Sequence, residues 1–383
     1  MKRVMQDERG IALAVAIFAL VIVGALVAGA FFAGTQEQRV ADNTRRLGQS
    51  FGVAEVGIGR QVARWDPARN NAVAKYPAAT LVVPDSSTAT GVFGGQVLKL
   101  NGNLYLIDII ARDSASRSGR LNSRGGARQR IGLLVRIQPL QMDIRASLTT
   151  QGGANLTGNA SVDGRDHVPV GWTDCEGGLD TSRAGIRNDA GTVSTSGNAT
   201  VAGTPPVMND TSVSDKTFTQ YGDVTYDQLA TRANVVLPGG TYRTEPTLRA
   251  DGSCDKGNLT NWGDGINRTA PCGNYFPVIH VTGSVTLNGV QGQGILLVDG
   301  DLEVQGDYQF YGVTIVRGRL KTAGGGSTDA HFWGAVMAEN VDIEFQNLSG
   351  SATLNYSKCA ITQALQMTGT VAPMVSRGWA QLF

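Results

Sequence analysis

An uncharged apolar segment near the N-terminus constrains this chain more than any other feature of its sequence. No ionisable side chain occurs between Gly10 and Gln36. About 24 apolar residues at about 1.5 Å each give a helix of about 36 Å, which crosses a hydrocarbon core of about 30 Å. The segment exceeds the roughly 7 to 15 apolar residues of a secretory signal. We therefore expect a cytoplasmic leader at 1–10 and a transmembrane helix at 11–34. Removal after the small residues Ala28 to Ala30 is the alternative.

The flanks of this segment bear on its orientation. Each side carries three basic residues, Lys2, Arg3 and Arg9 before the segment and Arg39, Arg45 and Arg46 after it. The positive-inside rule therefore gives no preference. The short leader is more easily retained inside than the long body, and the four cysteines, none in a CxxC pair, fit an oxidising compartment. We expect a single-pass inner-membrane protein, N-terminus inside, with its body in the periplasm or on the pilus or cell surface.

The helix is expected to continue beyond the membrane as an amphipathic helix at 35–66, until Pro67 ends it. Its apolar positions form one helical stripe, namely Val40, Leu47, Phe51, Ala54, Ile58 and Val62. Small residues inside the span have the spacing that lets helices approach closely, namely Gly24, Ala25, Ala28, Gly29 and Ala33. We expect these small residues to pack against other helices, together with Leu47, Phe51 and Glu55.

Three short motifs carry a resemblance to a known family. They are "RGIAL" at the start of the apolar segment, "QEQRVADN" at 36–43 and "FGVAEVGI" at 51–58. This N-terminal region resembles that of PilX-type minor pilins and pilus assembly proteins, within the type IV pilin class. The resemblance implies partners among other pilins and inner-membrane pilus assembly proteins, and cleavage between Gly10 and Ile11. Val15 stands where major pilins carry a glutamate, which implies a rare or terminal position in a filament and puts the cleavage in doubt.

Residues 67–140 are expected to form a small pilin-like β module on the helix. The stretches "GQVLKLNGNLYLIDIIARD" and "RQRIGLLVRIQP" have strand-like composition. Seven arginines and one acid, Asp113, lie between Arg112 and Arg136. A solvated hairpin loop is the expected interpretation of this basic segment. Binding of DNA or an anionic glycan is the alternative, but the net charge of +1 gives no general argument for nucleic acid.

Internal repeats dominate the remainder of the chain. "LTGNASVDG" at 156–164 recurs as "TSGNATVAG" at 195–203. Four further units start at 279, 296, 314 and 335, which gives spacings of 17, 18 and 21 residues. Stacking them produces two apolar columns, Val281/Val298/Val316/Met337 and Val285/Leu302/Leu320/Val341, with Gly283, Gly300 and Gly318 between them. Such periods are typical of solenoids, in which each coil buries its apolar face against its neighbours.

The fold class expected is mainly β with a long N-terminal α-helix, followed by a small α+β head and a β-helix domain. Glycine, at 50 of 383 residues, suits the many turns of such a domain. We place this Gly-rich β-solenoid at 141–383, with a loop-rich insertion at about 165–275. A β-sandwich is the alternative.

The charged side chains of the repeats argue against an enzyme. Asp299 and Arg317, and Asp301 and Arg319, are expected to pair on neighbouring coils, which favours solubility and register. A polysaccharide lyase would need converging acids, but the candidates are scattered, namely Asp299, Asp301, Glu303, Asp342 and Glu344. His280 is expected to pack beside Leu297, Ile315 and Val336, and the three histidines have no zinc spacing.

The segment around residues 251–272 raises two further questions. Asp251, Asp255 and Asp264 offer oxygen ligands for calcium but do not follow the EF-hand pattern, so an ordinary loop is the favoured interpretation. Cys254 and Cys272 flank a polar, glycine-containing stretch, and we expect them to form a disulfide that closes this loop. Buried free thiols are the alternative, and the sequence does not settle the state of Cys175 and Cys359.

Together these features predict a structural protein without cofactors. We expect a minor pilin or pilus assembly factor that presents an exported β-solenoid, with an adhesive role toward host or surface glycans. Two alternatives remain. One is a free membrane-anchored β-helix adhesin, and the other is a polysaccharide-active β-helix enzyme.

Overall fold

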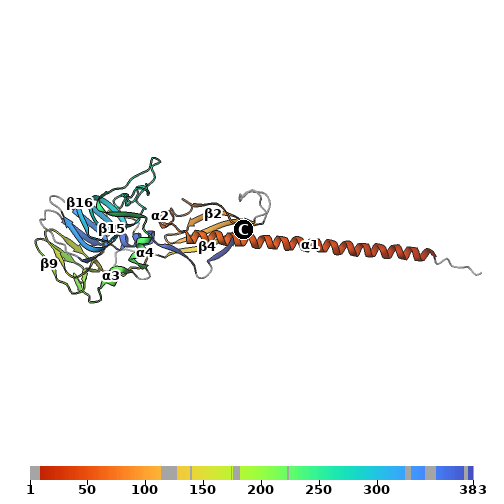
Figure 1. Ribbon diagram of the computed structural model, residues 1–383, viewed down its shortest axis with the longest axis horizontal. Coiled ribbons are helices and arrows are strands. Elements are labelled where there is room, and N and C mark those ends of the chain that lie inside the picture. Colours follow the sequence, from red (N-terminus) through yellow and green to blue (C-terminus); the bar gives the residue numbers. More distant parts are fainter. Residues whose placement is uncertain are drawn as a thin grey trace, which may run out of the picture.

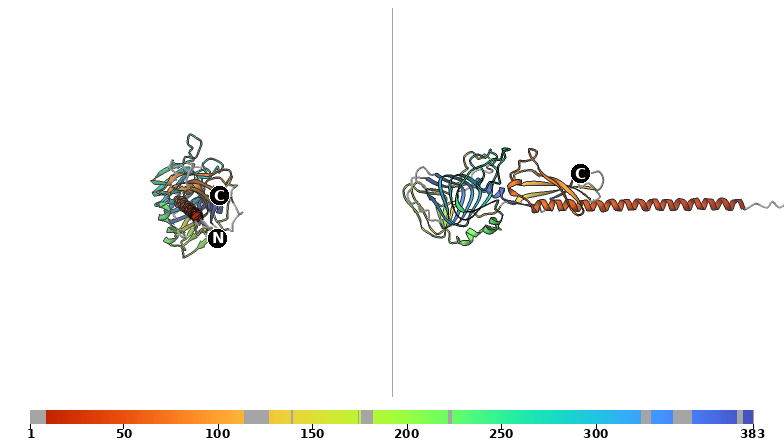
Figure 2. Two further views of the ribbon diagram at one scale, coloured as in Figure 1. Left: turned by 90° about the vertical axis from the view of Figure 1, so that its right-hand side faces the viewer. Right: turned by 45° about the horizontal axis from the view of Figure 1, so that its top comes forward.

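The computed structural model describes residues 9–113, 127–138, 140–173, 175, 182–221, 224–323, 329–340, 351–374 and 378–382. The molecule is elongated (Figure 1). A single long helix projects from one end, an antiparallel sheet packs on its C-terminal part, and a second, larger domain lies at the end remote from the N-terminus. The second views show the same arrangement, with the helix axis nearly in line with the large domain (Figure 2).

Helix α1 (Arg9–Ala63) is continuous over 55 residues. Its four glycines near residue 50 do not interrupt it, since the sheet packs on this part of the helix and supports it. After α1 the chain turns into the short helix α2 (Pro67–Asn70). Asp66 caps α2 by accepting a hydrogen bond from the Arg69 N–H at 3.2 Å, and Pro67 occupies a first-turn position where no N–H is needed.

The head is an antiparallel sheet that contains strands from both ends of the chain that follows α1. Strands β1 (Leu81–Ser87), β2 (Gly91–Lys99), β3 (Leu104–Asp113) and β4 (Arg128–Gln138) follow one another in order. Strands β19 (Thr370–Pro373) and β20 (Trp379–Leu382) then pair with β4. The chain therefore leaves the head after β4, builds the second domain and returns, whereas the sequence had assigned all of 141–383 to that domain.

The head buries only the C-terminal part of the apolar stripe expected on α1. The sheet covers Ser50, Val53, Ala54 and Ile58, and a Cβ added at Gly57 would lie 2.8 Å from the Phe93 ring. These smaller side chains let the sheet approach the helix closely. Ala54 and Ile58 belong to the expected stripe and Val62 packs against the head core, whereas Val40, Leu47 and Phe51 remain exposed.

The second domain is built on parallel strand pairs. Strands β14 (Val235–Thr244), β15 (Val278–Val298), β16 (Leu302–Ala323), β17 (Asp329–Asn340) and β18 (Ser351–Tyr356) pair in succession. Val285 lies opposite Leu302 and Val298 opposite Val316, as the repeat spacing predicts. Each pair in this series is parallel, unlike the antiparallel sheets of the β-sandwich alternative.

Seven short strands extend this stack on its other side. They are β5 (Ala146–Gln151), β6 (Ala154–Leu156), β7 (Ser161–Asp163), β8 (Ala184–Asn188), β9 (Val193–Thr195), β10 (Thr200–Ala202) and β11 (Val207–Asn209). β5 pairs with β17, and β7 pairs with β18. The chain enters the stack at β5, which lies in its middle, and adds β8 next to β5 and β11 next to β8. It then continues at the opposite end with β14 and returns through β15 and β16 to β17, which pairs with β5.

The segment 165–275, expected to be a loop-rich insertion, contributes β8 to β11 and β14 to this stack. It also holds α3 (Asp215–Thr219), β12 (Gln220–Tyr221), β13 (Val224–Thr225) and α4 (Tyr226–Thr231). Helix α5 (Lys358–Met367) follows β18 and packs on β15, β16 and β17. Short strands of three residues do not produce a strong alternation in the sequence, which is why this segment was interpreted as loops.

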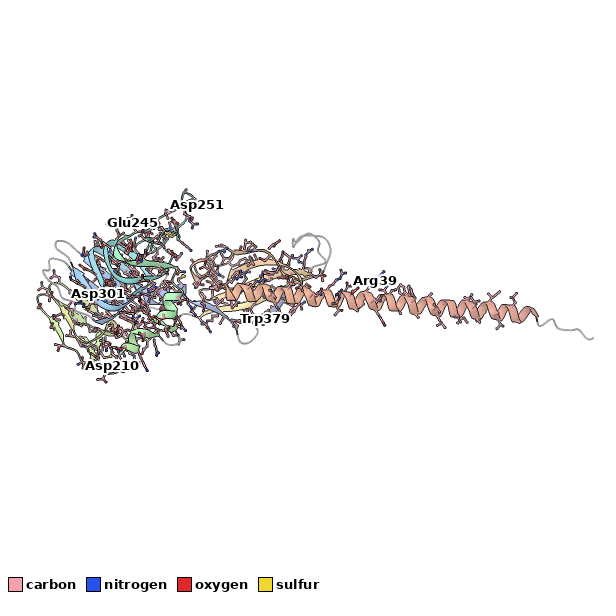
Figure 3. The ribbon with its side chains drawn as sticks, viewed as in Figure 1. Arg39, Asp210, Glu245, Asp251, Asp301 and Trp379 are labelled. Atoms are coloured by element: carbon pink, nitrogen blue, oxygen red, sulfur yellow. A yellow bond between two sulfur atoms is a disulfide. The ribbon has the colours of Figure 1, made fainter. Side chains whose placement is uncertain are left out.

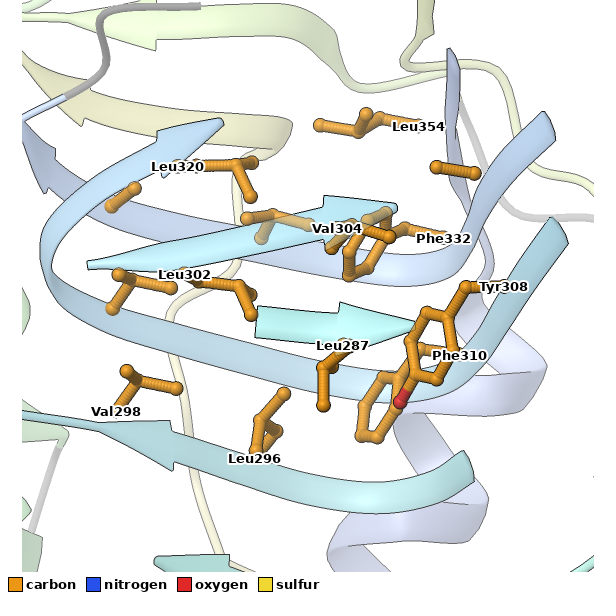
Figure 4. Close-up of a cluster of buried hydrophobic side chains, with 14 of the residues drawn as sticks. Leu287, Leu296, Val298, Leu302, Val304, Tyr308, Phe310, Leu320, Phe332 and Leu354 are labelled. Atoms are coloured by element: carbon orange, nitrogen blue, oxygen red, sulfur yellow. The ribbon is translucent and has the colours of Figure 1, made fainter. Parts of the chain in front are cut away.

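The interior of the stack is a continuous apolar core (Figure 4). Val281, Val298 and Val316 are all buried in one column, and the turn glycines stack, with the Gly318 N–H donating to the Gly300 carbonyl at 3.1 Å. The last step of the predicted register is wrong. Ala338, rather than Met337, lies opposite Val316.

This one-residue difference places Met337 opposite Ile315, on the other face of the strand. Val336 was expected beside Leu297 and Ile315, in the row next to His280. Met337 occupies that row instead, and Val336 lies in the apolar core on the other face. Val341, the last member of the second predicted column, lies outside the described residues.

Candidate interaction surfaces

The first half of α1 is an apolar surface that none of the described residues covers. It is the one helix in the described part of the chain that is long and apolar enough to cross a membrane, and its apolar window is not buried by any other part of the protein. A Cβ at Gly24 or Gly29 would meet no atom within 4 Å. Among the residues that the structure describes, the packing expected of Ala25, Ala28 and Ala33 has no partner, and it stays a prediction about other helices. The charged part of the helix begins at Glu37, two residues before Arg39, which Figure 3 labels.

The processing site stays a prediction as well. Gly10 lies in the first turn of α1, and the backbone of Ile11 is helical. Residues 1–8, which hold most of the leader, lie outside the described residues.

On the C-terminal side of its apolar half, α1 carries an exposed apolar face beside the head. Leu47 is 42% exposed and Phe51 41% exposed, and the two lie one turn apart on the same side of the helix. Glu55, which is one turn from Phe51, is exposed too. The three residues singled out for packing, Leu47, Phe51 and Glu55, therefore lie outside the head core and are available to a neighbouring helix.

The joint between the head and the parallel domain is built around one buried side chain, Asn71. Its Oδ1 accepts a hydrogen bond from the Trp65 indole N–H at 2.8 Å. Its NH₂ group donates to the carbonyls of Gln366 and Met367, both at 3.0 Å, and of Gly369 at 2.9 Å. Asn71 thus ties the end of α1 to the C-terminal end of α5, where the chain returns to the head. No motif in the sequence points to it.

A second polar cluster is buried within the head. Asp108 accepts two hydrogen bonds from Arg130, at 2.9 and 2.8 Å, and one from Gln96 at 3.0 Å. Burial alone would raise the pKa of Asp108, but the hydrogen bonds and charge of Arg130 and the hydrogen bond from Gln96 hold it below its usual value. Arg130 of the basic segment is therefore occupied structurally. Residues 114–126 of that segment lie outside the described residues.

The loop from 245 to 275 projects beside the parallel domain, with Asp251 near its tip (Figure 3). The Cys254–Cys272 disulfide expected from the sequence closes this loop, with an S–S distance of 2.07 Å. The Asn261 side chain donates hydrogen bonds to the carbonyls of Thr247 and Asp255, at 3.1 and 2.8 Å. Hydrogen bonds within the loop therefore fix its shape.

The three carboxylates considered for calcium each serve a different turn. Asp251 accepts from Ser253, Asp255 from the Gly257 N–H, and Asp264 from the Asn267 N–H and Gln291. Across the described residues, no three His, Cys, Asp or Glu side chains form a group that could hold a metal ion.

A disulfide between Cys175 and Cys359 also exists, with an S–S distance of 1.99 Å and a Cα–Cα distance of 5.4 Å. It joins the segment after β7 to the first turn of α5. The Asp166 carboxylate accepts a hydrogen bond from the Lys358 N–H at 2.8 Å at the same place, and the Ser147 hydroxyl donates to the Leu354 carbonyl at 2.9 Å nearby. These contacts reinforce the seam where the start and the end of the stack meet.

The expected charge pairs of the repeats are present in part. Arg319 lies 3.8 Å from the Asp301 carboxylate and its N–H donates to the same group at 2.8 Å. Asp299 instead accepts from the Tyr226 hydroxyl at 2.9 Å and lies 3.0 Å from His280, while Arg317 lies over the Tyr226 ring. The tyrosine comes from α4, a long-range contact that the repeat pattern cannot reveal.

Of the remaining lyase candidates, only Glu303 belongs to the described residues. Glu303 accepts a hydrogen bond from Gln305 at 2.7 Å. Asp342 and Glu344 lie outside the described residues.

Three glycines form corners of the parallel domain that the repeat pattern did not predict. Gly294, Gly312 and Gly334 lie side by side on β15, β16 and β17, each with φ between +111° and +138°. A Cβ at Gly334 would overlap the Gly312 carbonyl oxygen. These glycines recur along the sequence at the same intervals as Val298, Val316 and Ala338, and this common interval is the signal that could have revealed them.

The geometry defines a long helix with an apolar N-terminal half, an antiparallel head on its C-terminal half, and a large parallel-sheet domain inserted into that head. No protein-family model and no curated protein matches the sequence. One matching solved structure is that of the competence-associated pilin ComZ from Thermus thermophilus. It has 13% sequence identity and a TM-score of 0.22, over 87% of this chain and 97% of that chain. At this TM-score the match does not establish a shared fold.

Proposed function

We propose that this protein is a minor component or assembly factor of a type IV pilus-like system. The observation that carries the proposal is α1 itself, whose uncovered apolar half continues without a break into a half that packs on an antiparallel head. Such a helix can reside in a membrane and can equally pack among the helices of a filament. The PilX-like motifs of the N-terminal region support the same assignment, and the partners are then other pilins and inner-membrane assembly proteins.

We further propose that the parallel domain is a β-solenoid with an adhesive and non-enzymatic role. Successive parallel pairs, stacked apolar columns and aligned corner glycines support this assignment of the fold. In a cell with the N-terminus inside, the domain would lie farthest from the inner membrane, where it can meet an external surface. The competing proposal, a free membrane-anchored adhesin, shares every feature except the filament.

Fractionation of sheared pili tests the filament. We expect the wild-type protein in the sheared fraction, and we expect Phe51→Glu to reduce its amount there at least fivefold, because a carboxylate would face the neighbouring helix. Val82→Glu is the matched control, since Val82 is equally apolar and 68% exposed but lies on β1 at the edge of the head. Retention of the wild-type protein in membranes of a strain with abundant pili would contradict the proposal.

A further inference from the structure

A cleft of about 940 Å³ lies at the joint between the head and the parallel domain. One wall is formed by the end of α1, the β2–β3 turn and the end of β4, and the other by α4 and the start of β15. Figure 1 shows α2, α4 and β4 meeting in this region. The volume is in the range of about 300 to 1,000 Å³ that is usual for small-molecule sites, which also favour the boundaries between domains.

The charged residues of the cleft are of one sign. Arg136 from β4 and Arg232 from the end of α4 both line it, and no aspartate or glutamate is found among its described lining residues. Neither arginine forms an ion pair with any described residue, in contrast to Arg130, which is bound to Asp108. Two permanently charged guanidinium groups from two different domains therefore lack an acidic partner at one cleft.

Amide side chains complete the polar lining. The Asn103 Oδ1 is buried and has no hydrogen-bond partner in the described structure. A buried acceptor of this kind is rare in native proteins, and rotation of the Asn103 side chain toward the cleft would let the hydroxyl or N–H of a ligand donate to it. Asn234 accepts a hydrogen bond from the Val278 N–H at 3.0 Å through its Oδ1, which leaves its NH₂ group as a donor. Gln138 and Gln141 add further amides.

We propose that this cleft binds an acidic oligosaccharide. Arg136 and Arg232 would hold its carboxylate or sulfate, Asn103 would accept a hydrogen bond from a sugar hydroxyl, and Asn234 would donate one. A ligand with both a negative charge and hydroxyl donors is complementary to these guanidinium and amide groups, whereas a neutral apolar ligand would form no ion pair with either arginine. An adhesive use of this site rests on the function proposed above, whereas binding of an acidic oligosaccharide in the cleft does not depend on that function.

The two chain crossings between the domains also line the cleft, through Gln138, Leu140 and Gln141 on one side and Thr368 to Thr370 on the other. Gly369 is the residue whose carbonyl accepts from Asn71. A ligand held by Arg136 of the head and Arg232 of the parallel domain would therefore bridge the joint. Binding should slow amide hydrogen exchange at 368–370 as well as occupy the cleft.

Calorimetry on the full-length protein in detergent tests this site. The probes are a sulfated heparin-type hexasaccharide and a galacturonate hexamer, with maltohexaose as the neutral comparison and sodium sulfate as the anion alone. We expect the acidic hexamers to bind at least tenfold more tightly than maltohexaose or sulfate. Arg136→Gln with Arg232→Gln should weaken acidic-hexamer binding at least tenfold. Arg128→Gln with Arg243→Gln removes the same charge outside the cleft lining and should change it less than twofold.

Several outcomes would overturn the assignment. Equal losses in the two double variants would mean binding by net charge alone. Equal affinity for sulfate and the hexamers would leave an anion site without sugar recognition, and binding of duplex DNA but not of acidic sugars would assign a different partner. Absence of acidic-sugar binding by protein that still enters pili would remove this site while leaving the proposed function intact.

Discussion

Cys175 and Cys359 are joined by a disulfide although 184 residues separate them in the sequence. The bond lies beside the β7–β18 pair, where the first strands of the parallel domain meet its last strand. Stacking of this domain requires two distant parts of the chain to find each other, and the disulfide holds them together once they have done so.

Removal of this disulfide should cost more stability than removal of the other. In the chain-entropy model a loop of this length contributes about 5 kcal/mol, against about 3 kcal/mol for the 18-residue separation of Cys254 and Cys272. We expect Cys175→Ser with Cys359→Ser to lower the free energy of unfolding more than Cys254→Ser with Cys272→Ser. Denaturant unfolding under identical conditions measures both, and a larger loss in the second pair would contradict this expectation.

Gly334 should not tolerate a side chain. Its φ is +138°, and a Cβ there would overlap the Gly312 carbonyl oxygen of the neighbouring strand. Gly334→Ala is therefore expected to destabilise the protein by at least about 2 kcal/mol. Gly102→Ala is the control, because a Cβ at Gly102 meets nothing within 4 Å. Equal melting temperatures for the two variants would show that the corner is not constrained as described.

Asn71 should control the joint between the domains. Asn71→Ala would leave the Trp65 indole N–H and the carbonyls at the end of α5 without their partner, at a cost of roughly 3 kcal/mol. We expect faster proteolysis at 138–141 and 368–370 together with a lower melting temperature. Trp65→Phe, which removes one of these hydrogen bonds, should have a smaller effect.

Asn198→Ala serves as the control for Asn71, since Asn198 is exposed and its side chain donates to Asn159. A wild-type proteolysis pattern for Asn71→Ala would exclude the proposed role in the joint.

Asp163 should make the stability of the parallel domain depend on pH in acid. Burial alone would raise its pKa, but hydrogen bonds from the side chain and N–H of Arg165, and from His167, lower it to about 2. The unfolded value is about 3.9, so the carboxylate contributes stability above about pH 5 and loses it as the pH falls from about 5 toward 2. Since Arg165 is largely exposed, we expect this contribution to be roughly 1 to 2 kcal/mol.

The matching variant for this prediction is Asp163→Asn. Its free energy of unfolding, measured from pH 2 to pH 6, should fall less steeply with decreasing pH than that of the wild-type protein. Parallel curves for the two proteins would show that another group titrates in this window.

Part of the candidate surface could be predicted from the sequence, and part could not. Leu47 and Phe51 were chosen because they lie on an apolar helical stripe, and both are exposed in the structure. Asn71 and the cleft at the joint gave no such signal. An isolated asparagine has no periodic context, and Arg136 and Arg232 come from segments whose separation in the sequence says nothing about their distance in space.

The sequence by itself determined the long helix α1 and the stacking period of β15 and β16, because both follow from local patterns of apolar residues. Only the tertiary structure decided which face of α1 the head covers, that β19 and β20 return to β4, and that β5 and β7 meet β17 and β18. Strands with similar alternation can pair in many orders. The order adopted here depends on the packing of segments nearly 200 residues apart, where the core, the seam contacts and the Cys175–Cys359 bond favour one arrangement.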